Sequence, residues 1–308
     1  MPLNGGLGIH RSALSSHRPA EVRQKMNKST KIYMLVSGDG RIADQRNVGE
    51  RRTRFVLMLT MLLGTSCIVG AQHRIKSVSL EQAVTTVAID RPGDLYVTLH
   101  NGKVVRVDAD GNLLVLPDVV SPTLFDPRDG SRLFAYYRPA QRYAYHSSLQ
   151  EMSSHHVDSA FAIDPWLVCP SGDYNIWIAD AADNTIRKVN TATSRIDAEI
   201  SFQYDVRSIT YMREYQGFLF VLYPTRGIVV FSAMGRELRA IGKGDISWFN
   251  FLGEELYYAQ EGRLHFFNLF NTETRTMELP AKAAFSLVTD TRLFSVNKGT
   301  VEIFVTPR

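Results

Sequence analysis

Residues 175–190, with the sequence NIWIADAADNTIRKVN, define a pattern that recurs in degenerate form along most of the chain after residue 75. The pattern is a short apolar run that ends in a small or acidic residue, then a polar turn, then a second strand-like run. After residue 77 almost nothing has helical period, and strand-like runs rich in Val, Ile, Leu, Phe and Tyr alternate with Gly, Asn, Asp and Pro. The sequence therefore predicts an all-β chain.

The repeats have a spacing of about 40 residues, which is typical of architectures built from stacked supersecondary units. Six units can be delimited, at residues 77–117, 118–158, 159–200, 201–241, 242–280 and 281–308. Most of them are consistent with four strands, but the last contains only three. A spare alternating strand at residues 72–80 could supply the missing one and so close a ring.

Several strands are apolar on both faces, as at residues 218–223, 227–231 and 264–270. Strands of a β-sandwich, the alternative fold, alternate apolar and polar residues because one face meets water. Blades packed radially around an axis cover both faces without helices. The sequence therefore predicts a six-bladed β-propeller of four-stranded antiparallel blades, closed by an N-terminal strand.

Residues 51–71 are typical of a secretory signal peptide. Arg51, Arg52 and Arg54 precede the apolar run at 55–63, and small residues follow before Gln72. A transmembrane anchor is the alternative, but the apolar span is interrupted by Gly, Thr, Ser and Cys and falls short of the roughly 20 residues that cross a bilayer. We expect the propeller to occupy residues 72–308 of an exported protein, with no transmembrane span after processing.

A second form of processing would attach a lipid anchor to Cys67. Thr65 and Ser66 precede this cysteine in a segment that loosely resembles a lipobox, although Gly64 stands where Leu is usual. Residues 1–50 show no apolar periodicity and are rich in Gly, Ser and basic residues. We expect them to be a disordered extension or the product of a misassigned start codon, and no function is inferred from them.

Charge and cysteine content constrain the function of the folded part. Residues 1–71 hold 11 of the 35 Lys and Arg and 4 of the 31 Asp and Glu, which leaves 24 basic and 27 acidic side chains after them and a net charge of −3. This balance argues against nucleic acid as a partner. Cys169 is the single cysteine after residue 71, so no intramolecular disulfide is expected, and its apolar neighbours predict a buried, inert thiol.

The apolar strand at 176–180, the turn at 181–184 and the Ile-Arg-Lys strand at 186–189 resemble a unit of the NHL-repeat family. Residues 93–108 match more weakly, with His100 at the position of the acidic residue. The close resemblance covers about one repeat and a loose one most of the propeller. It implies the propeller fold, and it implies a binding platform more than an enzyme, because a minority of such propellers are enzymes.

Tyrosine residues are the clearest candidates for binding a partner. Tyr brings a large contact area at little cost in entropy and is enriched at interfaces. The densest group is predicted to form a patch that faces a protein partner, and it consists of Tyr136, Tyr137, Tyr143, Tyr145 and His146.

Metal-dependent catalysis is the alternative function. Six-bladed enzymes such as lactonases and hydroxyglycine lyases hold a metal at the central channel, and the resemblance directs attention to acidic residues near the innermost strands, which we expect to begin near Val84, Leu124, Trp166, Ser208, Ile246 and Phe285. The four candidate ligands are Asp90, Asp164, Asp205 and Asp245. Asp residues also occupy turns for structural reasons, and no cofactor is predicted. The Asp126–Gly130 segment is interpreted as a hairpin turn and not as a calcium loop.

We therefore expect an exported, non-enzymatic β-propeller in the periplasm or at the cell surface, which binds a protein partner or ligand of the bacterial envelope. A metal-dependent hydrolase or lyase acting at the central channel is the alternative.

Overall fold

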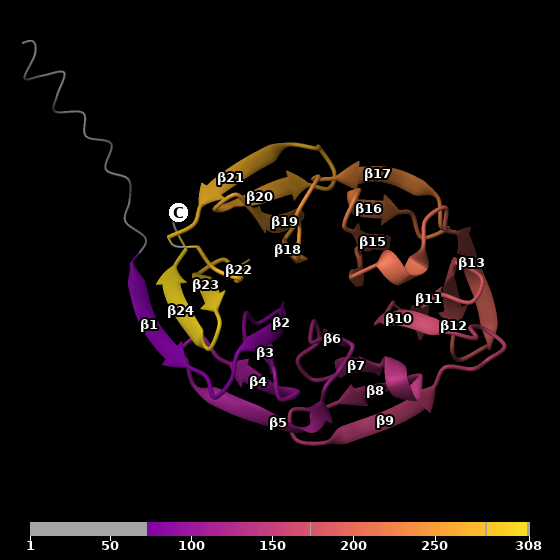
Figure 1. Cartoon of the computed structure of the whole chain (residues 1–308), viewed down its shortest axis with the longest axis horizontal. Coiled ribbons are helices and arrows are strands. Elements are labelled where there is room, and N and C mark those ends of the chain that lie inside the picture. Colours follow the sequence, from indigo (N-terminus) through magenta and orange to yellow (C-terminus); the bar gives the residue numbers. More distant parts are fainter. Residues whose placement is uncertain (1–72, 173, 281, 307–308) are drawn as a thin grey trace, which may run out of the picture. The chain divides into compact units, whose positions relative to one another are not determined.

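The computed structural model describes residues 73–172, 174–280 and 282–306. Their strands form six antiparallel sheets of four strands each, arranged as blades in a ring around a central channel (Figure 1). The chain is a six-bladed β-propeller, and the predicted fold is confirmed. The predicted segments at 1–50 and 51–71 lie outside the described residues.

Each of the first three blades is built from four consecutive strands, in order from the channel outward. Blade 1 contains β2 (Val84–Ile89), β3 (Leu95–Leu99), β4 (Lys103–Val107) and β5 (Leu113–Val120). Blade 2 contains β6 (Leu124–Asp126), β7 (Leu133–Tyr137), β8 (Arg142–His146) and β9 (Glu151–His156). Blade 3 contains β10 (Pro165–Pro170), β11 (Asn175–Asp180), β12 (Thr185–Asn190) and β13 (Arg195–Ser201).

Blades 4 and 5 repeat this order, and blade 6 takes its outermost strand from the other end of the described chain. Blade 4 contains β14 (Tyr211–Tyr215), β15 (Phe218–Tyr223), β16 (Gly227–Phe231) and β17 (Glu237–Ile241). Blade 5 contains β18 (Phe249–Leu252), β19 (Glu255–Gln260), β20 (Arg263–Asn268) and β21 (Thr274–Glu278). Blade 6 contains β22 (Phe285–Val288), β23 (Arg292–Asn297), β24 (Thr300–Val305) and β1 (Arg74–Ser79).

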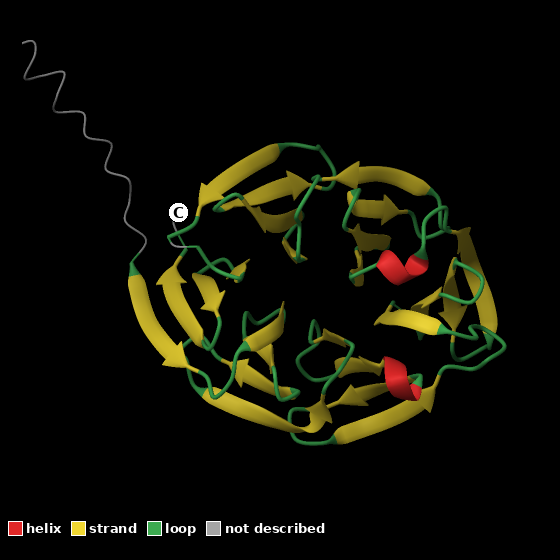
Figure 2. Ribbon diagram, viewed as in Figure 1, coloured by secondary structure: helices red, strands yellow, loops and turns green. Residues whose placement is uncertain are grey.

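Helical structure in the described ranges is confined to two short 3-10 turns, η1 (Arg138–Ala140) and η2 (Val206–Ser208), as Figure 2 shows. No helix among the described residues is long and apolar enough to cross a membrane.

The ring closes where β1 pairs with β24 in antiparallel register (Figure 1). Val78 lies opposite Val301 and is 7% exposed, whereas the side chains on either side of it along β1 are exposed. The spare strand predicted at 72–80 therefore completes blade 6, as the sequence indicates.

The middle strands of the blades are buried on both faces. Every residue of β3 and β16, and all of β15 except Phe218, is buried. Consecutive side chains of a strand point to opposite faces, so each of these strands is covered by the neighbouring blades on both sides. This observation confirms the reasoning that favoured a propeller over a sandwich.

Two innermost strands begin later than the sequence indicates. The strand β14 starts at Tyr211 and not at Ser208, because residues 206–208 form η2, whose first turn is capped by the Asp205 carboxylate accepting the Arg207 N–H at 2.9 Å. The strand β18 starts at Phe249 and not at Ile246. Because β14 and β18 begin three residues later than predicted, the predicted ligands Asp205 and Asp245 lie further from the channel-lining strands than the sequence indicates.

The best-preserved repeat depends on one buried carboxylate. Asp180, 1% exposed at the end of β11, accepts the backbone N–H groups of Ile163, Asp164 and Ala182 at 2.9–3.0 Å. Asn184 follows with a positive φ of 61° and donates from Nδ2 to the Phe202 carbonyl at 2.6 Å. Both residues fix turns, so the repeated motif is structural.

Blades 3 and 4 are joined by a buried hydrogen-bond cluster around Glu214 of β14. Its Oε2 accepts the indole N–H of Trp177 and the hydroxyl of Ser171, each at 2.5 Å, and lies 3.4 Å from Lys188 Nζ. The Lys188 ammonium also lies 5.4 Å from the Trp177 ring centroid. A buried carboxylate is tolerated here because it is paired with Lys188 and accepts two short hydrogen bonds.

Trp177→Phe should lower the free energy of unfolding by about 2 kcal/mol more than Trp248→Phe does, in urea titrations of both variants. Both tryptophans are buried, at 0% and 7% exposed, so they lose similar packing. The Trp248 indole N–H, in contrast, has no hydrogen-bond partner among the described residues. Equal losses in the two variants would show that the bond to Glu214 adds nothing to stability.

Candidate functional site

A pocket of about 570 Å³ lies at one end of the central channel. It is lined by the ends of the innermost strands and the turns that follow them in blades 1, 4, 5 and 6, together with Arg128 from blade 2. Ligand pockets commonly have volumes of about 300–1,000 Å³, so this pocket can hold a small molecule or an extended side chain.

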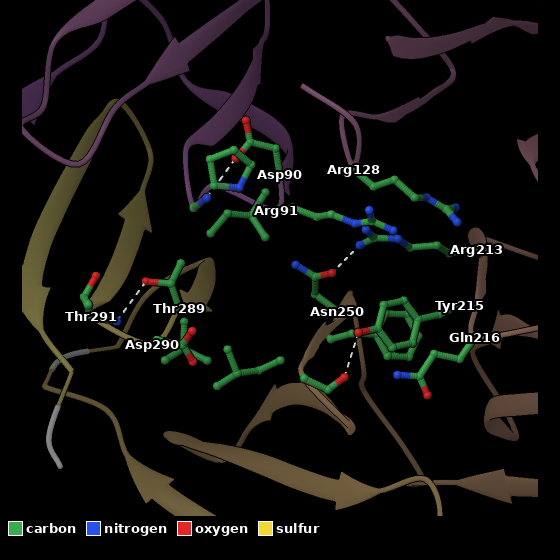
Figure 3. A pocket seen from close by; sticks show the side chains of 17 residues that line it. Asp90, Arg91, Arg128, Arg213, Tyr215, Gln216, Asn250, Thr289, Asp290 and Thr291 are labelled. Atoms are coloured by element: carbon green, nitrogen blue, oxygen red, sulfur yellow. Dashed lines mark hydrogen bonds between the residues drawn. The ribbon is translucent and has the colours of Figure 1, made fainter. Parts of the chain in front are cut away.

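Two arginines of the pocket wall, Arg128 and Arg213, appear in Figure 3, and both contact the buried carboxylate of Asp126, which does not itself line the pocket. Asp126, whose side chain is 1% exposed, accepts Arg128 Nε at 3.0 Å through Oδ2, and the same oxygen lies 3.7 Å from Arg213 Nε. Arg213 also donates from Nη1 to Oδ1 of Asn250. The pocket therefore presents two guanidinium groups that are held in place by hydrogen bonds to residues of blades 2 and 5.

The charge on Asp126 is stabilised by its neighbours. Burial alone would raise the pKa of this carboxyl, but the positive charges of Arg128 and Arg213 outweigh it and hold the pKa well below its usual range. Asp126 is therefore ionised at neutral pH and serves as the counter-charge of both arginines.

Asp90, in the turn of blade 1, is committed to local structure. Its Oδ1 accepts the backbone N–H groups of Gly93 and Asp94 at 2.9 and 2.8 Å, and its Oδ2 accepts the Tyr96 hydroxyl at 3.2 Å. Burial raises the pKa of Asp90, although the hydrogen bonds from Asp94 and Gly93 oppose it. An Asp that closes its own turn has little capacity left for a metal ion.

Aromatic rings form the apolar part of the wall. Tyr215 stacks on Phe251 with ring centroids 4.1 Å apart and an interplanar angle of 6°, and its hydroxyl donates to the Gly253 carbonyl at 2.7 Å. The Arg213 guanidinium lies 5.6 Å from the Phe251 ring centroid. These contacts join blades 4 and 5 and hold the Arg213 side chain against the channel wall.

The four predicted metal ligands do not converge. Asp90 directly follows β2, whereas Asp164, Asp205 and Asp245 precede the innermost strands of their blades. The pocket gathers the far ends of these strands, so Asp90 lies at the opposite end of the channel wall from the other three, roughly 15 Å away along a strand of this length. Asp164 instead pairs with Arg207 at 2.8 Å.

Within the described ranges, no group of three or more His, Cys, Asp or Glu side chains could hold a metal ion. His155 and His156 lie exposed on β9, where neighbouring residues face opposite sides of the sheet.

Cys169 is fully buried, as the sequence predicts, and burial raises the pKa of its thiol well above the usual range.

The predicted tyrosine patch lies mostly inside blade 2. Tyr136 and His146 are 0% exposed and Tyr143 is 6% exposed, so a partner could reach only Tyr137 and Tyr145. Tyr136 donates its hydroxyl to the Pro165 carbonyl of blade 3, and the Arg132 guanidinium lies 3.9 Å from the Tyr145 ring centroid. The rings therefore fill contacts between blades and their edges, and a binding role for the group stays a prediction.

His146 should make the protein less stable in mild acid. Burial lowers its pKa, so between this value and the unfolded value of about 6.5 the unfolded chain binds the proton more readily. The free energy of unfolding should therefore fall as pH drops below about 6.5, by no more than about 1.4 kcal/mol per pH unit from this one group.

Urea titrations between pH 7.5 and 5.5 check this expectation. His146→Gln should remove this part of the pH dependence, whereas His156→Gln, which removes an exposed imidazole from the next strand, should retain it. An unchanged pH dependence in His146→Gln would contradict the assignment.

Sequence reasoning missed Arg128, Arg213 and Asn250. Arg128 lies in the Asp126–Gly130 segment, which the sequence indicates to be a hairpin turn. Arg213 and Asn250 lie in β14 and β18, whose predicted starts are three residues before the observed ones. Arg213-Glu214 inside an otherwise strand-like run was the available signal, since charged residues are almost never fully buried unless paired.

Comparison with known proteins identifies the fold and no closer relationship. No family model matches the sequence, and no curated protein matches it, so the NHL-repeat resemblance stays a prediction. Among solved structures, the WD40 β-propeller domain of Doa1 is 12% identical with a TM-score of 0.52, over 77% of this chain and 97% of that one. A chain of the Mitotic Checkpoint Complex is 9% identical with a TM-score of 0.52, over 77% and 96%.

A Streptogramin B lyase structure is 10% identical with a TM-score of 0.48, over 76% of this chain and 87% of that one. Identities this low show a shared fold alone. The chain is a β-propeller of six four-stranded blades, with a polar, arginine-lined pocket at one end of its channel.

Proposed function

We propose that this protein is a non-enzymatic binding module that takes its ligand, or an exposed segment of a protein partner, into the pocket at the end of the central channel. The observation that carries the proposal is the pocket itself, which five of the six blades build together. The pocket forms only when the ring is closed, because no single blade contains it.

The polar groups of the pocket support binding because they are held in place before any ligand arrives. Arg128 is held by Asp126, Arg213 by Asn250, and the Tyr215 hydroxyl by the Gly253 carbonyl. Side chains that are already ordered lose little entropy when a ligand binds, so more of the contact energy appears as affinity.

The binding role can be tested with the full chain by NMR, using a panel of small neutral, cationic and anionic compounds. At least one class should shift the backbone amides of Gln216, Gly253 and Thr291, which lie in the pocket turns. The amides of Asn101 and Glu261, in turns at the other end of their blades, should not shift. If no compound of any charge class moves the pocket amides, the proposed function fails.

We further propose that the protein is exported and acts in the periplasm or at the cell surface, with an envelope protein as its partner. The support is the basic, apolar and small-residue order of residues 51–71. Mass analysis of the native N-terminus should find a chain that starts at Gln72, or a lipid on Cys67 if the alternative processing applies. A native chain that retains residues 51–71 would contradict export by this signal.

A further inference from the structure

Three arginines, Arg91, Arg128 and Arg213, line the pocket together with Asp90 and Asp290, and Asp126 contacts two of them from behind the wall. Asp126 is the counter-ion of both Arg128 and Arg213, and its Oδ2 accepts two donors of Arg128, Nε at 3.0 Å and Nη2 at 2.5 Å. The 3.7 Å separation from Arg213 Nε is too long for a hydrogen bond. Arg213 therefore shares a carboxylate that is already occupied.

Arg213 is buried and incompletely bonded. Its side chain is 6% exposed, its Nε has no hydrogen-bond partner within the described ranges, and the hydrogen bond found for it there goes to Asn250. A guanidinium has five N–H donors, and leaving a buried, charged donor unpaired is unfavourable. The structure thus keeps a charged donor group where an acceptor is missing.

A second guanidinium faces it across the channel. Figure 3 shows Arg91 and Arg213 pointing towards one another, and they come from blade 1 and blade 4, which lie opposite in the ring (Figure 1). Two guanidinium groups that converge repel each other, and an anion that binds between them removes this repulsion. Planar guanidinium groups also match the two oxygens of a carboxylate or phosphate.

The other side of the pocket has a different character. Asp290, Thr289 and Thr291 line it from the turn of blade 6, at a distance from the arginines in Figure 3. Hydroxyls and a carboxylate accept hydrogen bonds from hydroxyl or amino groups. This arrangement gives a bound molecule a defined direction, with its acidic end towards Arg213.

We propose that the pocket binds a small polar oxyanion, a carboxylate or phosphate compound whose acidic group lies between Arg91 and Arg213. This inference rests on the proposed binding role and specifies the chemistry of its ligand. The rest of the ligand carries hydroxyl or amino groups that reach Asp290 and Thr291, since the Thr289 hydroxyl is bonded within its own turn.

The test uses the full chain at low ionic strength with three probes: inorganic phosphate, succinate and succinamide, the uncharged counterpart of succinate. NMR titration should show saturable shifts of the Gln216, Gly253 and Thr291 amides with phosphate or succinate and none with succinamide. Binding of succinate alone assigns a carboxylate ligand, and binding of phosphate alone assigns a phosphate ligand.

Two variants compare the loss of a pocket arginine with the loss of an arginine outside the pocket. Arg91→Gln removes an exposed guanidinium of the pocket, and Arg263→Gln removes one whose side chain is 52% exposed on β20, so both lower the net charge equally. Anion affinity should fall by about tenfold in Arg91→Gln and stay unchanged in Arg263→Gln. Because Arg91 lies in an exposed turn, its replacement should leave the fold intact.

Three results would overturn the inference. Equal weakening in the two variants would show unspecific attraction by net charge, and equal binding of succinamide and succinate would show that the charge is not recognised. If uncharged compounds shift the pocket amides while phosphate and succinate do not, the pocket binds ligands but the oxyanion assignment is wrong. That last result separates a failure of this inference from a failure of the proposed function.

Discussion

Asp126→Asn should lower the free energy of unfolding by about 3 kcal/mol, because it leaves two guanidinium groups without their counter-charge. The side chain of Asp126 is 1% exposed and that of Arg213 6%, so little water can take the place of the lost carboxylate. Arg128 is 22% exposed and can be partly solvated, which places the expected loss at the lower end of the range for broken buried ion pairs. Urea titration at neutral pH measures this loss.

The exposed ion pair between Glu81 and Lys103 provides the control. Its atoms are 3.2 Å apart, but the side chains are 70% and 48% exposed. Glu81→Gln should therefore change stability by less than about 0.5 kcal/mol. If Asp126→Asn were as mild as Glu81→Gln, the buried carboxylate would not be what holds the two arginines in the channel.

Deleting β1 should lower the melting temperature by roughly 10 °C, which corresponds to about 3–4 kcal/mol for a protein of this size. The strand supplies the outer ladder of β24 and buries Val78 against the core of blade 6. Without it, β24 becomes an unpaired edge and the ring has no link between its first and last strands. Exposed edges of this kind also promote association between chains.

The comparison needs two chains, one that begins at His73 and one that begins at Glu81, so that β1 is the difference between them. Calorimetry should show the lower melting temperature in the shorter chain, and light scattering should show its association. In the full chain, Val78→Asp should destabilise strongly because Val78 is 7% exposed, whereas Ser79→Asp, at the next and exposed position, should not. Equal stability of the two truncated chains would contradict closure by β1.

Most of the fold could be predicted because it depends on local patterns. The runs at 218–223 and 227–231 are apolar on both faces, and β15 and β16 are buried on both faces. The alternating run at 72–80 predicted the closing strand, since an incomplete last unit and a spare first strand complement each other. Strand starts were predicted less accurately at β14, which the 3-10 turn η2 precedes, and at β18, which begins at Phe249.

The candidate site could not be predicted in the same way. Asp126 and Arg128 are two residues apart and resemble an ordinary turn, whereas their partner Arg213 is more than 80 positions further along the chain. Only closure of the ring brings these side chains to one wall. The tyrosines of blade 2 form a dense cluster in the sequence, and only the structure shows that Tyr136 and Tyr143 are buried.

Periodicity, turn residues and two-sided apolar strands are local properties of the chain, so the all-β class, the six repeats and the closing strand can be predicted from them. The tertiary structure alone decided which polar residues meet. Asp126, Arg213 and Asn250 converge from blades 2, 4 and 5 because the ring turns the inner edges of its blades towards one channel. These side chains are buried at the channel, and a charge removed from water must be paired within the protein or by a ligand.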